Sequence, residues 1–121
     1  MLWAQDSAGH LTIDVDGAYR FNYTLTNSTW SHVVLTWNSA NLFTLYVNGS
    51  SVGTYQAPST PAYLSRALMV AFGTGYNGYF TGLIDEGRIS STARSAAWIA
   101  SEFNNQNSPG TFLSVGAQES P

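Results

Sequence analysis

The sequence contains no cysteine and no lysine, and these two absences exclude several classes of function. Without cysteine the chain can form neither a disulfide bond nor a thiolate metal site. Four arginines against seven acidic residues give a formal charge of -3 at pH 7. Nucleic-acid binding requires a basic surface, so we expect no DNA or RNA partner.

Charged residues and long apolar runs are also scarce. Only 9% of the residues are charged, against roughly a quarter in an average domain. No apolar run approaches the ~20 residues of a membrane helix, so we expect no membrane insertion. The first ten residues have neither a basic nor an apolar region, so we expect no signal peptide in them. Hydroxyl, amide and aromatic side chains dominate instead, which predicts a β-rich extracellular or particle-surface protein.

Short segments of alternating apolar and polar residues recur at about ten-residue spacing, with turn residues between them. Asp16-Gly17 and Asn48-Gly49 are strong hairpin signals. Eight strands are predicted, at residues 10–16, 18–24, 30–38, 42–47, 51–56, 64–72, 79–89 and 111–116. At 121 residues, the chain is predicted to form one all-β domain, a sandwich or barrel spanning residues 1–121.

The segment 79–103 is predicted to be central to this fold. Its first part, residues 79–89, mixes apolar and polar side chains on both faces, as an interior strand does. Its second part predicts a short helix from Ala96 to about Asn104, with Ser95 as the N-cap. Ile99 and Phe103 lie four residues apart, so they share the face that packs on the sheet.

Three blocks resemble the laminin G-like branch of the concanavalin A-like lectin/glucanase domains, in its bacterial or phage type. They are WSHVVLTW at residues 30–37, LYVNG at residues 45–49 and FTGLIDEGRI at residues 80–89. The resemblance extends over about residues 30–116. It implies an antiparallel jelly-roll β-sandwich with one short helix near the C-terminus, and a role in binding glycans or other surfaces, in some members with Ca²⁺.

Two departures from the family pattern carry expectations of their own. Where this chain has Gly87 the family usually carries valine, so we expect a β-bulge or a close backbone approach there. The family usually has two or three strands before the segment at residues 2–23. We therefore expect a shortened variant, or a homo-oligomer or partner chain that completes the sandwich edge.

The acidic residues give no clear catalytic or metal site. Asp85 and Glu86 are adjacent on the predicted strand and point to opposite faces, so they are interpreted as structural, with Glu86 pairing with Arg88. No carboxylate pair with period-two spacing, as in related glucanases, is present, so we predict no enzyme activity and no catalytic residue. We predict no metal ligand and no cofactor, although Ca²⁺ at Asp14 and Asp16 stays an open alternative.

The aromatic residues supply the candidate binding site. We expect Trp30, Trp37, Phe43, Phe72, Phe80 and Phe103 to lie in the core. The predicted ligand-binding residues are Trp3, Tyr46, Tyr76, Asn77 and Tyr79, because exposed rings suit a sugar face or a protein interface. A role in closing the sandwich is an equal alternative for them.

We therefore predict a non-catalytic binding module for carbohydrate or another exposed surface. The alternative is a structural protein of a particle surface, such as a virion decoration or fibre module. A glycan or a protein surface is the expected partner.

Overall fold

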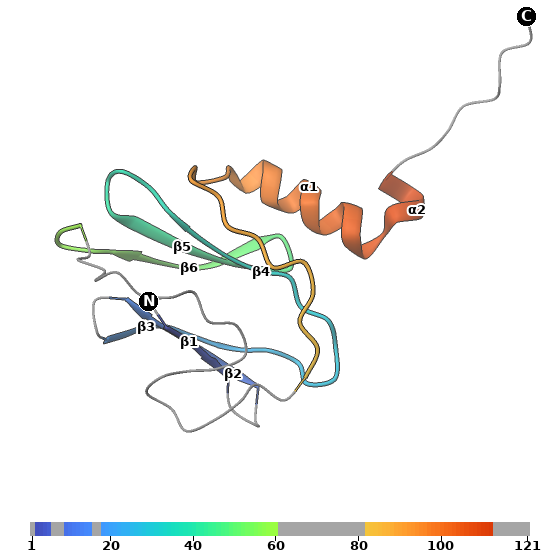
Figure 1. Ribbon diagram of the computed structural model, residues 1–121, viewed down its shortest axis with the longest axis horizontal. Helices are drawn as coiled ribbons and strands as arrows, with labels where there is room; N and C mark the ends of the chain where they lie inside the picture. The colour runs from blue at the N-terminus through green and yellow to red at the C-terminus, as the bar shows by residue number, and fades with distance from the viewer. Residues whose placement is uncertain (1, 6–8, 16–17, 61–81, 113–121) are drawn as a thin grey trace, which may run out of the picture.

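The computed structural model describes residues 2–5, 9–15, 18–60 and 82–112. In this part the chain is mostly β, with two antiparallel three-stranded sheets and a helix packed outside one of them (Figure 1). The predicted strand at residues 64–72 and the first residues of the predicted strand 79–89 lie outside the described residues.

The first sheet has the order β1-β2-β3, formed by Leu2–Gln5, His10–Val15 and Ala18–Thr24. Leu11, Ile13 and Val15 are buried at alternate positions of β2, as predicted. Ile13 pairs with Phe21 but the next residue, Asp14, pairs with Tyr19, so Arg20 is an extra residue in β3. This bulge explains why Tyr19 is exposed although Phe21 is buried, contrary to the face that simple alternation predicts.

The second sheet has the order β4-β5-β6, formed by Val33–Trp37, Leu42–Val47 and Ser50–Gln56. The β5–β6 turn has φ 49° at Asn48 and 78° at Gly49, as the two-residue hairpin signal predicts. β4 begins three residues later than predicted. Trp30 therefore precedes the strand and is 67% exposed, so its assignment to the core was wrong.

The two sheets pack face to face around one apolar core. Side chains that alternate along β2 and β5 fill it, joined by Phe21 of β3. The buried members of this core are Leu11, Ile13, Val15, Phe21, Phe43, Leu45, Val47 and Ala57. Phe43 confirms the core prediction and stacks on Trp37, with 5.6 Å between ring centroids. Trp37 itself, at the end of β4, is 39% exposed, so its assignment to the core was wrong.

The helix α1 spans Ala96–Asn107 and lies against the second sheet, on the side away from the first (Figure 1). Its N-cap is Ser95, whose hydroxyl accepts a hydrogen bond from the Trp98 N–H at 3.2 Å, as predicted. Ile99 is fully buried. No helix in the described part of the chain is long and apolar enough to cross a membrane.

The end of the chain differs from the prediction in two respects. α1 continues to Asn107, about three residues beyond its predicted end. A second short helix, α2, spans Pro109–Phe112, so residues 111 and 112 do not begin a strand. Proline is favoured at the first position of a helix, where its missing N–H is not needed, and this explains the start of α2.

The predicted interior strand is also wrong over its described part, residues 82–89. These residues have no strand assignment, and Leu83 and Ile89 are 77% and 79% exposed. Glu86 has φ 53°, and its N–H donates to Asp85 Oδ1 at 2.8 Å. This local side-chain hydrogen bond competes with a ladder and interrupts the extended backbone. A Cβ on Gly87 would meet no atom of the described residues within 4 Å, so none of these residues makes the expected close backbone approach.

Candidate functional site

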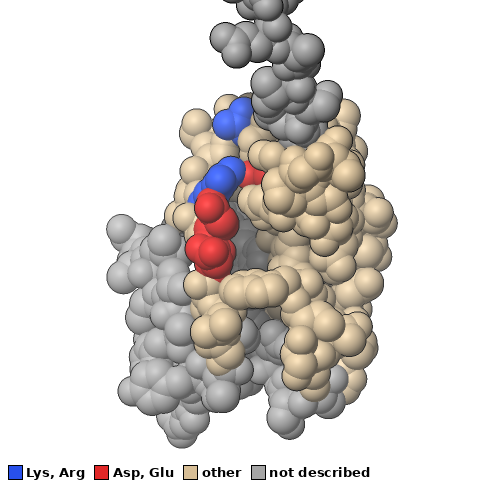
Figure 2. Space-filling model, turned by 90° about the vertical axis from the view of Figure 1, so that its right-hand side faces the viewer, with Lys and Arg blue, Asp and Glu red and all other residues tan. Residues whose placement is uncertain are grey.

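A shallow groove of about 220 Å³ lies between α1 and the segment at residues 82–94. It is lined by Arg88, Trp98, Ser101, Glu102 and Asn105. Figure 2 shows charged side chains gathered along one side of a hollow on this face. Pockets that enclose a whole small ligand are typically 300–1,000 Å³, so this groove suits part of a larger ligand lying on the surface.

The helical period explains why these side chains share one face. Ser101, Glu102 and Asn105 follow Trp98 by three, four and seven residues, so all four lie along one stripe of α1. Ile99, one position after Trp98, points about 100° away and is buried. Anchoring of α1 through Ile99 therefore leaves the Trp98 indole at the surface, where it is 40% exposed.

An ionic network joins the segment 82–94 to α1. Arg88 donates to Glu86 Oε2 through Nε at 3.1 Å and through Nη2 at 2.7 Å, which confirms the predicted pair. Its Nη1 donates to Glu102 Oε1 on α1. The hydrogen bond with Glu86, then the negative charges of Glu86 and Glu102, raise the pKa of Arg88. The guanidinium thus stays charged and links the two walls of the groove.

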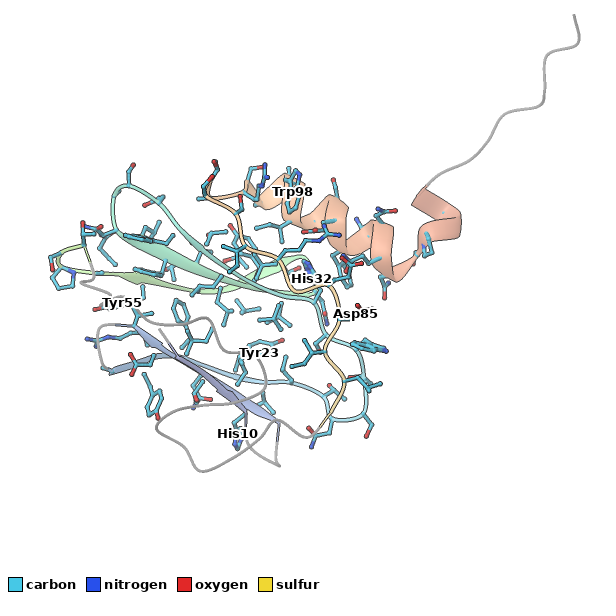
Figure 3. The ribbon with its side chains drawn as sticks, viewed as in Figure 1. His10, Tyr23, His32, Tyr55, Asp85 and Trp98 are labelled. Atoms are coloured by element: carbon cyan, nitrogen blue, oxygen red, sulfur yellow. The ribbon has the colours of Figure 1, made fainter. Side chains whose placement is uncertain are left out.

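His32 extends this network toward the second sheet. Its Nε2 lies 3.7 Å from Glu102 Oε2, and its ring lies 6.1 Å from that of Phe103. The backbone around it is held by Asn48, whose Oδ1 accepts from the His32 N–H and whose N–H donates to the His32 carbonyl. Figure 3 shows His32 beside the sheet beneath α1. The His32 ring therefore packs between the second sheet and α1, and Asn48 fixes its backbone.

The chemistry of the groove combines one aromatic surface with polar donors and acceptors. The Arg94 guanidinium lies 4.9 Å from the centroid of the Trp98 ring, a cation–π contact that holds the ring in place. Ser101 supplies a hydroxyl and Asn105 an amide beside it. Such a surface can stack on an apolar ring face and hydrogen-bond to the hydroxyls at its edge.

The residues predicted to bind a ligand do not gather at this groove within the described part of the chain. Tyr76, Asn77 and Tyr79 lie outside the described residues, as does the side chain of Trp3. Tyr46 is only 8% exposed, so the prediction that its ring is exposed was wrong. Tyr46 alternates with the core residues Leu45 and Val47, so it faces the side of the sheet that α1 covers (Figure 1).

The acidic residues take part in local bonding. Asp85 accepts the Glu86 N–H, and Glu86 is paired with Arg88, so both have the structural contacts expected of them. Of the two aspartates considered for Ca²⁺, Asp14 and Asp16, only Asp14 falls within the described residues. No group of three or more histidine, aspartate and glutamate side chains there could hold a metal ion.

Sequence reasoning missed Trp98, although a signal for it was available. Once Ile99 and Phe103 define the buried face of the predicted helix, Trp98 must lie on its flank, and serine, glutamate and asparagine follow it at helical spacing.

Comparison with known proteins places this geometry in a family context. Residues 1–100 match the laminin G-type family model described as the concanavalin A-like lectin/glucanases superfamily. No curated protein matches the chain. A solved structure, residues 221–444 of an S-layer domain-containing protein from Clostridium thermocellum, is 27% identical with a TM-score of 0.52. The match covers 78% of this chain and 49% of that one, so this chain spans about half of its length.

Proposed function

This chain belongs to the concanavalin A-like lectin/glucanase superfamily, and we propose that it is a non-catalytic module that binds carbohydrate on an exposed surface. Its ligand site is the groove lined by Arg88, Trp98, Ser101, Glu102 and Asn105. The whole chain, residues 1–121, acts as one domain, a concanavalin A-like jelly-roll sandwich. Its place of action is extracellular or on a particle surface.

The observation that carries this proposal is the half-exposed Trp98 ring beside hydroxyl, amide and carboxylate groups on one helix face. A sugar ring has an apolar C–H face and hydroxyls around its edge, so it needs both kinds of contact at once. The open, shallow form of the groove suits one residue of a surface glycan.

The chemistry of the groove favours a neutral sugar over an acidic one. Within the described residues, the Arg88 guanidinium donates its hydrogen bonds to Glu86 and Glu102, so its charge is already balanced within the protein. The carboxylates of Glu86 and Glu102 are matched by the guanidinia of Arg88 and Arg94, so the groove carries no excess positive charge. An acidic glycan would therefore gain no electrostatic attraction there over a neutral one.

Two further observations support a surface role. The solved relative is an S-layer domain-containing protein, and its name places that protein at a cell surface layer. The low content of charged residues and the abundance of serine, threonine and asparagine are typical of surface proteins.

Catalysis is excluded from the proposal because Asp85 and Glu86 are engaged in local bonds. The Asp85 carboxylate accepts a hydrogen bond from the Glu86 N–H, and the Glu86 carboxylate accepts one from Arg88, so neither carboxylate is arranged as a glycosidase acid or nucleophile. A reducing-sugar assay with a soluble β-glucan should show no hydrolysis. Hydrolysis that is lost in Asp85→Ala or Glu86→Ala would contradict the non-catalytic assignment.

The test of glycan binding is affinity electrophoresis through gels that contain a soluble β-glucan, xylan or mannan, with polygalacturonate as the acidic comparison. We expect retardation in a neutral gel, and at least a tenfold weaker affinity for Trp98→Ala, which corresponds to about 1.4 kcal/mol. Trp30→Ala is the matched control, because Trp30 is also an exposed indole but does not line the groove. Equal loss in both variants, or in neither, would refute the groove as the site.

The loop tyrosines and Trp3 remain proposed contacts in addition to the groove. Tyr76, Asn77 and Tyr79 form one candidate loop, and Trp3 is a separate candidate. A Tyr76→Ala variant in the same gels tests the loop. Loss of retardation there, with Trp98→Ala unaffected, would move the site from the groove to the loop.

A structural role in the assembly of a particle surface is the second candidate function. The observation that favours it is the exposed apolar character of the segment at residues 82–89.

A further inference from the structure

The segment at residues 82–90 has the sequence of a strand but lacks a strand partner among the described residues. No backbone–backbone hydrogen bond within the described chain involves it. Leu83, Ile84 and Ile89 are its large apolar side chains, and all three are exposed. Unpaired backbone groups beside exposed apolar side chains form a template for another extended chain.

Two copies of this segment are complementary in charge when they run antiparallel. In an antiparallel pair, the two residues directly opposite one another point to the same face of the sheet. In two identical strands related by a twofold axis, this requires the axis to pass through a residue and not between two residues. With Gly87 on the axis, Glu86 lies opposite Arg88 of the second copy, and Arg88 lies opposite its Glu86. An axis through Glu86 would instead place two glutamates together, which is unfavourable.

We propose that a second copy of this chain pairs with residues 84–90 as an antiparallel strand centred on Gly87. The Glu86–Arg88 pair, now within one chain, is exchanged for two such pairs between chains. A Cβ at Gly87 would meet nothing within 4 Å among the described residues, so these residues leave space around the axis.

One backbone change accompanies this pairing. Glu86 has φ 53° in the single chain, which is a left-handed value disfavoured for a residue with a Cβ. In the ladder Glu86 becomes extended, so the strain is released as the strand forms. Arg88 keeps its second partner, Glu102, and the segment stays attached to α1.

The association requires no glycan, although Arg88 also lines the groove, and it is expected to be weak. A seven-residue ladder buries less than the roughly 1,200 Å² of a standard interface. We expect a dissociation constant of about 0.1 mM, so the dimer forms at high local concentration, as on a surface that displays many copies.

Charge reversal provides the test. In Glu86→Arg two arginines face each other across the axis, and in Arg88→Glu two glutamates do, so each variant alone should associate at least about tenfold more weakly than the wild type. An equimolar mixture of the two variants restores both opposite-charge pairs. Arg94→Glu is the control, because it makes the same charge change as Arg88→Glu at a residue outside the segment.

The measurement is sedimentation equilibrium without glycan, up to about 1 mM protein, and circular dichroism of each variant checks its fold. The expected result is a mass that rises toward twice 13.1 kDa for the wild type, the mixture and the Arg94→Glu control, and a mass for each single variant that rises only at concentrations at least about tenfold higher. A monomeric wild type, a mixture that stays monomeric, or loss of association in the control would overturn the proposal. Because no glycan is present, failure of the dimer proposal in this experiment can be distinguished from failure of the glycan-binding proposal in the gels.

Discussion

Replacement of Gly49 by alanine tests how α1 is mounted on the second sheet. Gly49 has φ 78°, a value that costs an alanine about 1–2 kcal/mol. A Cβ there would lie 3.1 Å from Phe103 Cδ1 and 3.3 Å from the Cα of Ala100. The phenyl ring can move aside, but the helix backbone cannot, so crowding adds about 1 kcal/mol or more. We expect Gly49→Ala to lower the free energy of unfolding by about 2–3 kcal/mol.

The assay is urea denaturation followed by circular dichroism, with the denaturant dependence compared between variants. Gly49→Asn separates the two effects, since asparagine tolerates a left-handed backbone but carries the same Cβ. Gly110→Ala is the control, because a Cβ at Gly110 meets nothing within 4 Å. If Gly49→Ala unfolds at the same urea concentration as the control, α1 does not pack on the β5–β6 turn in the way described.

Three further predictions concern the helix and its ionic network. Ile99→Ala should destabilise the protein by about 2–4 kcal/mol, since Ile99 is fully buried, whereas Trp98→Ala should cost less; thermal denaturation that ranks them the other way would contradict the helix orientation. Ser95→Ala should cost about 1 kcal/mol through loss of the N-cap, with Ser101→Ala close to neutral as the control in the same melts. The ion pairs of Arg88 raise its pKa, so their contribution to the free energy of unfolding is complete below the ordinary arginine pKa and is lost only as the pH rises through the pKa of the folded state. The difference in the free energy of unfolding between wild type and Arg88→Met should therefore stay constant from about pH 6 to 9. A steady decline of this difference over that range would contradict the prediction.

Local sequence signals predicted much of the fold. The Asn48-Gly49 turn, the period-two pattern of β2 and β5, and the Ser95 cap are features that depend on a few neighbouring residues, and the structure confirms them. The family resemblance is likewise confirmed by the family match over residues 1–100. The mostly β, antiparallel character of the fold follows from these signals.

Features that depend on distant contacts could not be read from the sequence. The extra residue Arg20 in β3 turns Tyr19 outward, and nothing in the alternating pattern marks that bulge. Tyr46 is buried on the face of β5 that a helix fifty residues later covers. The segment 82–89 has strand alternation, but a strand also needs a pairing partner, and Glu86 leaves the extended region instead.

The candidate site was the least predictable part for the same reason. Exposure of an aromatic residue on a short helix depends on which neighbour anchors the helix, and here that anchor is Ile99. The groove exists only because Arg88 ties the segment 82–94 to Glu102 across the sequence. Tyr76 and Tyr79 were predicted from local composition, which cannot detect a contact between residues distant in the sequence, such as Arg88 and Glu102.

The most direct test of the glycan-binding account is an NMR titration of the ¹⁵N-labelled chain with an oligosaccharide of the polysaccharide that retards it. The four tryptophan indole signals, assigned through tryptophan-to-phenylalanine variants, report on separate places in the chain. The account predicts saturable shifts of the Trp98 indole and the Asn105 side-chain amide, with the Trp30 and Trp37 signals unchanged. Shifts that spare Trp98 and fall on the loop at residues 76–79 would contradict the groove as the binding site.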